Sequence, residues 1–315
     1  MNVLKYILRA PTNKLQSVCH RKLSTEATKM NFETILYTKV GRVAHIALNR
    51  PGSLNAITMD MPMELHQAVR AANADDDVRV ILLYGKGKAF CSGYDLKQFA
   101  EGERGSAPGS QTMPWCPYKD YSQVMHPCTD AFMSLWRSLK PVVCKIHGYA
   151  VAGGSDIALC SDIIYMADDA LIGYPPSRLW GCPTTAMWVY RVGAEKAKRL
   201  LLTGDLIDGQ EAARIGLVCK SVPAAELDSE TDRLVNRIAS VPTNQLFFQK
   251  QVINQAVEQM GLASTQRLAT IFDGMTRHSP EGVAFQERCR EVGFKEAVLE
   301  RDEGDWGAQG PSSKL

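Results

Sequence analysis

Residues 140–162 read Lys-Pro-Val-Val-Cys-Lys-Ile-His-Gly-Tyr-Ala-Val-Ala-Gly-Gly-Ser-Asp-Ile-Ala-Leu-Cys-Ser-Asp, and this run decides the fold. Its apolar first half is typical of a buried strand, and Gly153 and Gly154 predict a sharp turn into a helix with Asp156 in its first turn. A ligand can approach a glycine backbone closely, and free N–H groups at a helix N-terminus favour negative charge. The run therefore predicts an anion-binding turn, with Asp156 as the nearest acid or base.

Strand-like and helix-like segments alternate on both sides of this run. The expected strands are residues 32–40, 42–48, 78–84, 142–147 and 163–167, with helices starting near 58, 130 and 156. Such alternation implies crossover connections and a layered α/β core, which we place at residues 32–223. Beyond Pro223, the segments 224–240, 244–260, 265–277 and 280–303 have helical patterns without a convincing strand, so residues 224–315 are predicted to be a C-terminal helical region.

The composition of the chain limits the kinds of binding partner that we expect. The chain has 315 residues, 45% of them hydrophobic, and a formal net charge of +2. Basic and acidic residues are interspersed, so we expect neither nucleic acid nor a membrane as a partner. The nine cysteines are odd in number and are never spaced C-x-x-C, which argues against a disulfide framework or a zinc site and fits a reducing compartment. No metal or redox cofactor is indicated.

The first 30 residues differ from the rest of the chain. They carry six basic residues against one acid, Glu26, with apolar residues interleaved. Organellar presequences are amphipathic, basic and poor in acids, whereas the apolar run here is too short for a membrane span. We predict a mitochondrial targeting peptide at 1–30, cleaved near residues 21–24, and a matrix location. The alternative is a disordered basic tail on a cytosolic protein.

Several motifs resemble, in order, those of the crotonase superfamily, whose best-known members are the enoyl-CoA hydratases. They lie at residues 48–56, 88–96, 140–162, 202–205 and 212–218. The resemblance implies a spiral of repeated ββα units, C-terminal helices used in trimerisation, and a homotrimer or a homohexamer built as a dimer of trimers. It also implies an acyl-CoA substrate, with coenzyme A entering as part of the thioester and no further cofactor. One scaffold serves many chemistries, so the fold alone does not settle the reaction.

The same resemblance implies an oxyanion hole made of two backbone N–H groups, those of Tyr94 and Gly153. Such donors stabilise the enolate of a thioester. Taken without the pairing, the glycines at 93 and 153–154 would indicate only a helix-entry turn and tight strand–helix packing. The loop around Tyr94 is further expected to hold the adenine end of coenzyme A, so the implied substrate-binding residues are Cys91, Ser92, Gly93, Asp95, Leu96, Gly154 and Lys295.

The acidic residues depart from the hydratase pattern. Hydratases have a glutamate where this chain has Asp156, and a second glutamate where it has Pro176. A further acid found in the dienoyl-CoA isomerases of the superfamily would align with Thr185, which is neutral. Asp156 is thus the one acid in the motif, and it is predicted to be catalytic. Its alternative role is to stabilise the dipole of its helix.

Neutral and basic groups are candidates to fill the gap. Ser177 and Thr185 could orient a water, Tyr174 could donate a hydrogen bond, and Arg178 could pair with a substrate carboxylate or keep Asp156 ionised. The alternatives are a packing role for Tyr174 and a surface or intersubunit ion pair for Arg178. His126 and His147 complete the set of possible proton carriers.

A second departure is an insertion between Phe99 and Thr129. A polar, glycine-rich stretch is followed by the aromatic run that begins at Trp115. In the superfamily this segment covers the acyl pocket, so we predict that Trp115, Tyr118 and Tyr121 shape the acyl site, with Trp136 as a further candidate.

Three functions remain open at this point. The leading one is an acyl-CoA lyase of the enoyl-CoA hydratase type, with Asp156 as acid–base residue and Tyr94 and Gly153 as the oxyanion hole. The second is an enoyl-CoA isomerase or another enolate-forming enzyme, since one carboxylate can take a proton out and return it. The third is a non-catalytic CoA-binding scaffold.

Overall fold

The structure is a computed structural model and describes residues 32–102 and 113–304. The predicted targeting peptide at 1–30 and most of the glycine-rich part of the insertion lie outside these ranges. Among the described residues, no helix has the length and apolar character needed to cross a membrane.

Six strands form the main sheet, in the order β1-β2-β3-β4-β6-β9. The β1–β2 pair is an antiparallel hairpin, turning at Gly41 with φ of 56°, and the remaining neighbours are parallel. This arrangement confirms the predicted hairpin and crossover connections. The strands are β1 (Ile35–Val40), β2 (Val43–Leu48), β3 (Val80–Gly85), β4 (Val142–Ile146), β6 (Ile163–Ala167) and β9 (Lys220–Val222).

The run that decides the fold divides between two sheets. Its first part is β4, but residues Tyr149–Val151 form β5, which pairs with β7 (Leu171–Gly173) in a second, three-stranded sheet completed by β8 (Leu206–Asp208). Helix α5 (Gly153–Leu159) follows at once. The strand, turn and helix are therefore confirmed, while the short intervening strand was not expected and the helix begins three residues earlier than predicted.

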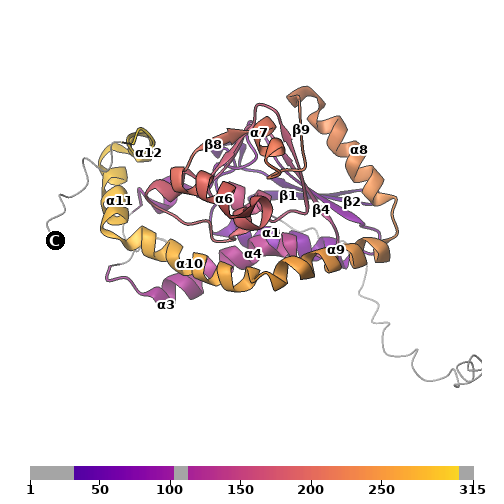
Figure 1. Cartoon of the computed structure of the whole chain (residues 1–315), viewed down its shortest axis with the longest axis horizontal. Coiled ribbons are helices and arrows are strands. Elements are labelled where there is room, and N and C mark those ends of the chain that lie inside the picture. The colour runs from indigo at the N-terminus through magenta and orange to yellow at the C-terminus, as the bar shows by residue number, and fades with distance from the viewer. Residues whose placement is uncertain (1–31, 103–112, 305–315) are drawn as a thin grey trace, which may run out of the picture. The chain divides into compact units, whose positions relative to one another are not determined.

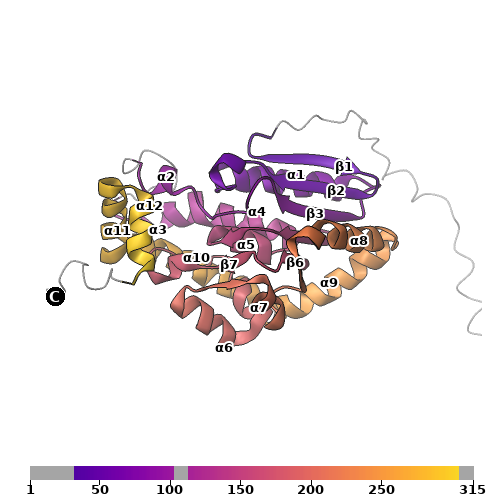
Figure 2. The same cartoon turned by 90° about the horizontal axis from the view of Figure 1, so that it is seen from above.

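Alternate side chains of the main sheet face two different layers, as the period of two along a strand requires. One set, which includes Ala44, Ile46 and Ile81, packs in the large core with helices α1 (Asp60–Ala74) and α4 (His126–Trp136). The opposite set, which includes Val80 and Leu82, packs against α8 (Leu227–Ala239). Figure 2 shows α1 and α8 beside the strands that they cover.

The chain after Pro223 is helical in the described residues, as predicted. The helices after α8 are α9 (Thr243–Gln259), α10 (Leu262–His278), α11 (Pro280–Val292) and α12 (Phe294–Asp302). The single helix expected at 280–303 is instead two, because Gly293 has φ of 86° and ends α11. In Figure 1, α9 and α10 run one after the other along the side of the core that carries α4, and α10 contacts α4 directly.

The remaining helices differ in length from four to 17 residues. They are α2 (Leu96–Phe99), α3 (Pro117–Asp120), α6 (Met187–Thr203) and α7 (Gly209–Arg214), with 3₁₀ turns at Pro51–Ser53, Pro175–Arg178 and Ala224–Glu226 and a π-helical turn at Tyr121–Met125. The α3 helix and the π turn belong to the aromatic part of the insertion, and both contact α10. The described aromatic part of the insertion therefore lies against α10.

Candidate active site

The first turn of α5 is seated directly on the strand-like segment that begins at Cys91. Cys91 N donates to Tyr149 O at 2.9 Å, and Val151 N donates to Cys91 O at 3.0 Å. A Cβ atom at Gly154 would lie 2.4 Å from Cys91 O, a distance that real side chains do not tolerate. Only glycine fits at position 154, so the close approach of these two segments explains Gly154.

Two neighbouring turns bring Tyr94 and Gly153 together. Gly93 has φ of 93°, and a Cβ atom placed on it would lie 2.7 Å from Ala152 Cβ and 3.4 Å from Gly153 N. Ala152 has φ of 52° and ψ of −128°, a strained conformation for a residue with a side chain. Its carbonyl accepts from Ser155 N at 2.9 Å and Ser155 Oγ at 2.6 Å, which holds the turn in place.

The backbone N–H groups of Tyr94 and Gly153 are available to a ligand. Within the described residues neither group donates a backbone hydrogen bond, whereas Asp95 N donates to Ile57 O and Ala152 N donates to Gly173 O, both at 3.0 Å. Gly153 is the first residue of α5, where the partial positive charge of a helix end lies. Two such donors on adjacent loops can stabilise negative charge on a carbonyl oxygen.

Asp156 lies beside these donors, in the first turn of α5, and its side chain is buried at 2% exposure. Its Oδ1 accepts from Thr185 N at 3.3 Å and from the Thr185 hydroxyl. Burial raises the pKa of Asp156 to about 7, although the two hydrogen bonds from Thr185 act in the opposite direction and the negative charge of Asp273 adds to the rise. A carboxyl group with such a pKa can both take and return a proton near neutral pH.

Of the groups that were candidates to fill the gap left by Pro176, the structure brings Thr185 to Asp156. Tyr174 is buried, and its hydroxyl donates to Cys182 O at 3.0 Å. Ser177 Oγ donates to Tyr174 O at 2.9 Å. These two side chains thus support the loop that precedes Thr185.

Arg178 contacts other groups instead of Asp156. Its guanidinium pairs with Asp302 at 3.0 Å and with Asp205 at 3.4 Å, and it donates to Thr203 O. These contacts fit the alternative interpretation, in which Arg178 forms a surface ion pair. They do not fit the hypothesis that Arg178 keeps Asp156 ionised.

The two histidines are engaged elsewhere. His147 Nε2 lies 2.9 Å from Gly87 O. The ring of His126 stacks on Tyr121 with centroids 5.1 Å apart. Neither arrangement favours a role for these residues as proton carriers.

The loop expected to hold coenzyme A is fixed by its own chain. Asp95 forms an ion pair with Arg50 at 2.9 Å, Cys91 Sγ donates to Asn55 O at 3.1 Å, and Ser92 N donates to Leu54 O at 3.0 Å. Leu96 begins α2 and packs in a small cluster with residues of α11 and α12. Lys295 is exposed on α12, where the neighbouring Phe294 N donates to Glu101 Oε1 at 2.7 Å. Lys295 and the residues that follow α2 therefore lie in the same region.

The aromatic residues of the insertion divide between different places. The Trp115 ring stacks on His278 of α10 with centroids 5.2 Å apart, and Tyr121 is the partner of His126. Tyr118 is 76% exposed. Trp136 lines a different cavity. These stacking contacts join Trp115 to α10 and Tyr121 to α4, and the role of the aromatic residues in shaping the acyl site stays a prediction.

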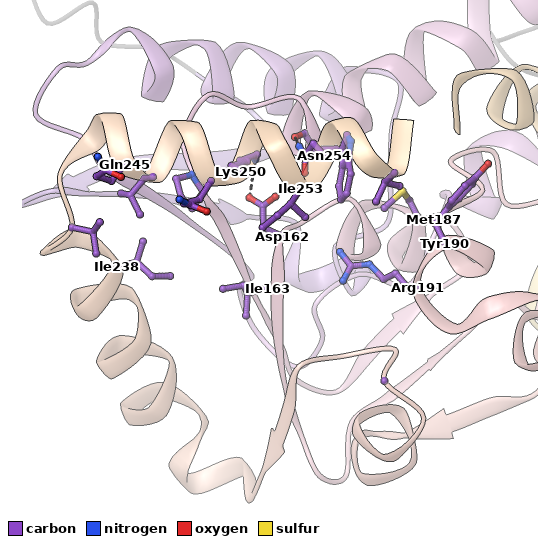
Figure 3. Close-up of a pocket in the computed structure, with 17 residues that line it drawn as sticks. Asp162, Ile163, Met187, Tyr190, Arg191, Ile238, Gln245, Lys250, Ile253 and Asn254 are labelled. Atoms are coloured by element: carbon purple, nitrogen blue, oxygen red, sulfur yellow. Dashed lines mark hydrogen bonds and ion pairs between the residues drawn. The ribbon is translucent and has the colours of Figure 1, made fainter. Parts of the chain in front are cut away.

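That different cavity, of about 510 Å³, lies between α9 and the main sheet. Figure 3 shows Lys250 of α9 facing Asp162, and the two side chains form an ion pair at 2.7 Å. Asp162 Oδ2 also accepts from Val142 N at 2.7 Å, so the last residue of the fold-deciding run anchors β4 and α9 together. Most of the other lining residues are apolar, among them Ile163, Ile238 and Ile253.

Sequence reasoning missed three polar residues near the site, all on α10. They are Gln266, Asp273 and Arg277, and all are buried. Asp273 and Arg277 form an i, i+4 ion pair at 2.9 Å, a spacing that was visible in the sequence but that usually marks a solvated helix face. In the described residues no cluster of histidine, cysteine or acidic side chains could hold a metal ion.

Comparisons with known proteins identify the family of the chain. Residues 38–296 match the family model described as Enoyl-CoA hydratase/isomerase. A Dictyostelium discoideum protein, named as a probable mitochondrial enoyl-CoA hydratase, is 32% identical, with 87% of this chain and 97% of the relative covered. The crystal structure of an enoyl-CoA hydratase from Mycobacterium smegmatis is 47% identical, with a TM-score of 0.81 over 87% of this chain and 94% of that one.

A third comparison extends the fold match. The crystal structure of an enoyl-CoA hydratase/isomerase from Xanthobacter autotrophicus is 29% identical, with a TM-score of 0.79 over 90% of this chain and all of that one. The predicted α/β fold and the resemblance drawn from the sequence motifs are confirmed. The chain belongs to the enoyl-CoA hydratase/isomerase family.

Proposed function

We propose that this enzyme is an enoyl-CoA hydratase in which Tyr94 and Gly153 form the oxyanion hole and Asp156 carries the proton. One observation carries the proposal. Two backbone N–H groups without partners among the described residues lie on adjacent loops, beside a buried carboxyl group whose pKa is raised to about 7. The N–H donors can stabilise an enolate and the carboxyl group can transfer a proton, and addition of water next to a thioester requires both.

The chemistry then runs through a single carboxylate. The thioester oxygen accepts hydrogen bonds from the two N–H groups. Ionised Asp156 takes a proton from water as the water oxygen bonds to Cβ, and the electrons of the double bond move into an enolate whose charge lies on the thioester oxygen. Asp156 then returns the proton to Cα as the carbonyl re-forms. Thr185, which donates to the same carboxylate, fixes its orientation.

A second candidate, double-bond isomerisation, is favoured by one observation. Position 176 is proline, so this segment offers no second carboxylate beside Asp156. Moving a proton from one carbon to another needs one acid–base group, whereas the usual hydratase pattern has two. The two reactions share the oxyanion hole and differ in whether water is added.

Incubation with crotonyl-CoA in ¹⁸O-labelled water separates the candidates. We expect a 3-hydroxyacyl-CoA product that contains the label, measured by mass spectrometry. With a 3-enoyl-CoA substrate, a shifted double bond without label would instead favour the isomerase. Tight binding of both thioesters without turnover of either would favour a non-catalytic CoA-binding scaffold.

The rate of hydration should depend on pH in a defined direction. Below about pH 7 the raised pKa keeps Asp156 protonated and unable to accept a proton from water, so kcat should rise with pH through an apparent pKa near 7. Dehydration should rise in the same way, because Asp156 must be ionised to remove the Cα proton. Steady-state rates from pH 5 to 9 in both directions test this. A hydration rate that falls above pH 7 would show that the protonated form is the active one.

We also propose the assembly, cofactor requirement and location. Apolar side chains are exposed along α9 and α10, including Phe248, Val252, Met260, Phe272 and Met275, and they support a homotrimer or a homohexamer. The proposed substrate is an acyl-CoA, bound by the loop that begins at Cys91 and by Lys295, with no cofactor besides the thioester. A mitochondrial matrix location and a targeting peptide at 1–30 are supported by the basic N-terminal composition and by the name of the Dictyostelium relative.

A further inference from the structure

Helix α10 turns a polar face toward the candidate active site. Gln266, Asp273 and Arg277 are spaced by seven and by four residues, so they lie along one side of the helix. All three side chains are buried. Burying a polar or charged side chain costs free energy unless the side chain is paired. The partners of these three residues therefore indicate the role of this face of α10.

Gln266 and Asp273 each bond to a backbone group of one short loop, and Gln266 Nε2 also donates to Met133 Sδ at 2.9 Å. Gln266 Nε2 donates to Thr185 O at 2.8 Å, and Asp273 Oδ1 accepts from Cys182 N at 3.0 Å. The loop from Cys182 to Thr185 is therefore held at both ends by α10. Its last residue, Thr185, is the one that donates to Asp156.

Arg277 connects Asp273, which holds this loop, to Asp120 of the insertion. Its Nε donates to Asp273 Oδ2 at 2.9 Å, and its terminal nitrogen donates to both oxygens of Asp120 at 2.8 and 2.9 Å. Asp120 approaches so closely that a Cβ atom at Gly274 would lie 2.2 Å from its Oδ2. One guanidinium thus pairs with two carboxylates, the buried Asp273 and the partly buried Asp120, and Asp156 is a third carboxyl group nearby.

We propose that Asp273 is a positioning residue, which holds the loop from Cys182 to Thr185 and through Thr185 fixes the carboxyl group of Asp156. The inference rests on the proposed function, in which that carboxyl group carries the proton. Both oxygens of Asp273 are already engaged, one by Cys182 N and one by Arg277, so Asp273 acts through the loop and through its charge.

The charge of Asp273 shifts the pKa of Asp156 in a predictable direction. A negative charge near a carboxyl group disfavours its ionisation, and Asp273 contributes in this sense to the raised pKa of Asp156. The other polar or titratable groups that face this pair come from α4, α5, α10, the insertion and the loops: Tyr94, Asp120, Cys128, Cys160, Tyr174, Cys182, Thr185, Arg277 and His278. Among them Arg277 is the cation that pairs directly with Asp273, and Asp120 is its other partner.

Asp273→Asn tests the proposal. Asparagine can still accept from Cys182 N, but it removes the charge, and its amide nitrogen cannot accept from Arg277 Nε as Asp273 Oδ2 does, so the side chain that holds the loop is itself no longer fixed. The protonation of Asp156 is followed by infrared spectroscopy, as the carboxylic C=O band that disappears in Asp156→Asn. We expect the midpoint of this band in Asp273→Asn to fall by about one pH unit. The acid limb of kcat should move with it, kcat at its optimum should fall about tenfold, and KM should change by less than about twofold.

Asp162→Asn is the matched control. Asp162 also accepts from one backbone N–H, that of Val142, and from one buried cation, Lys250, but its contacts lie in the cavity under α9. It should lower stability without moving the infrared midpoint or the acid limb. An unmoved midpoint in Asp273→Asn, or an equal shift in Asp162→Asn, would overturn the proposal.

A second variant covers the case in which Asp273→Asn does not fold. Gln266→Leu removes the donor to Thr185 O, and we expect a fall in kcat of about tenfold with KM nearly unchanged. Unchanged kcat in this variant would also overturn the proposal. The infrared midpoint is measured without turnover, so a shift in an enzyme that fails to hydrate crotonyl-CoA would support the positioning role while removing the proposed reaction.

Discussion

Asp156→Asn is expected to lower kcat by about 10³-fold, because general acid–base catalysis contributes roughly 10² to 10⁴ and this carboxyl group is proposed to perform both proton transfers. Asparagine keeps the shape of the side chain and can still accept from Thr185, so substrate binding should change little. Hydration of crotonyl-CoA measures the loss. Asp130→Asn is the control, since Asp130 pairs with Arg137 on an exposed face of α4. An unchanged kcat in Asp156→Asn would remove the acid–base role.

The same variant should be more stable than the natural protein at alkaline pH. In the unfolded chain the pKa of this carboxyl group returns to 3.8, whereas in the folded protein it is about 7. The ionised form is therefore disfavoured by folding, and stability decreases as pH rises from about 4 to 7. Removing the carboxylate should add on the order of 3 kcal/mol at pH 8 and clearly less at pH 5. Urea unfolding at both pH values tests this, and equal gains would contradict the raised pKa.

Gly154→Ala is the second change with a large expected effect. Its new methyl group would lie 2.4 Å from Cys91 O, a backbone atom that cannot rotate away. The first turn of α5 must then move off the segment that leads to Tyr94, which separates the two proposed oxyanion donors. Misaligning such a donor costs roughly 10² to 10³ in rate, so kcat/KM should fall at least about 100-fold.

Gly52→Ala is the matched control for this variant, because a Cβ atom at Gly52 meets nothing within 4 Å. It should leave both kcat/KM and stability unchanged. The Gly154→Ala protein should also unfold at lower urea concentration. A folded Gly154→Ala protein with full activity would show that the spacing of the two loops does not limit the reaction.

Sequence reasoning reached the centre of the site because its signals are local. Gly154 marks a close approach to backbone that no other residue permits, and an acid in the first turn of the same helix is predicted from spacing alone. Pairing Tyr94 with Gly153 needed the family motifs, since the two residues are far apart in the chain. The structure places them side by side, as the resemblance implied.

The residues of α10 that hold the candidate site could not be predicted from the sequence in the same way. A buried polar face on α10 has the same residue types as a solvated one, so Asp273 and Arg277 were indistinguishable from a surface ion pair. Which loop they hold depends on how the C-terminal helices fold back over the core. The broken helix at Gly293 is a different kind of miss, because glycine was visible there and the helical pattern on both sides concealed the stop.

Ala152 lies between the two loops of the proposed oxyanion hole. Its methyl group fills the space next to Gly93, and it stands between the loop of Tyr94 and the loop of Gly153 like a spacer of one carbon atom. Its φ of 52° would suit glycine better, so a chain selected only for stability would carry glycine at this position. On the proposed mechanism the strained alanine keeps the two loops apart, and thereby leaves room for the thioester oxygen between the two donors.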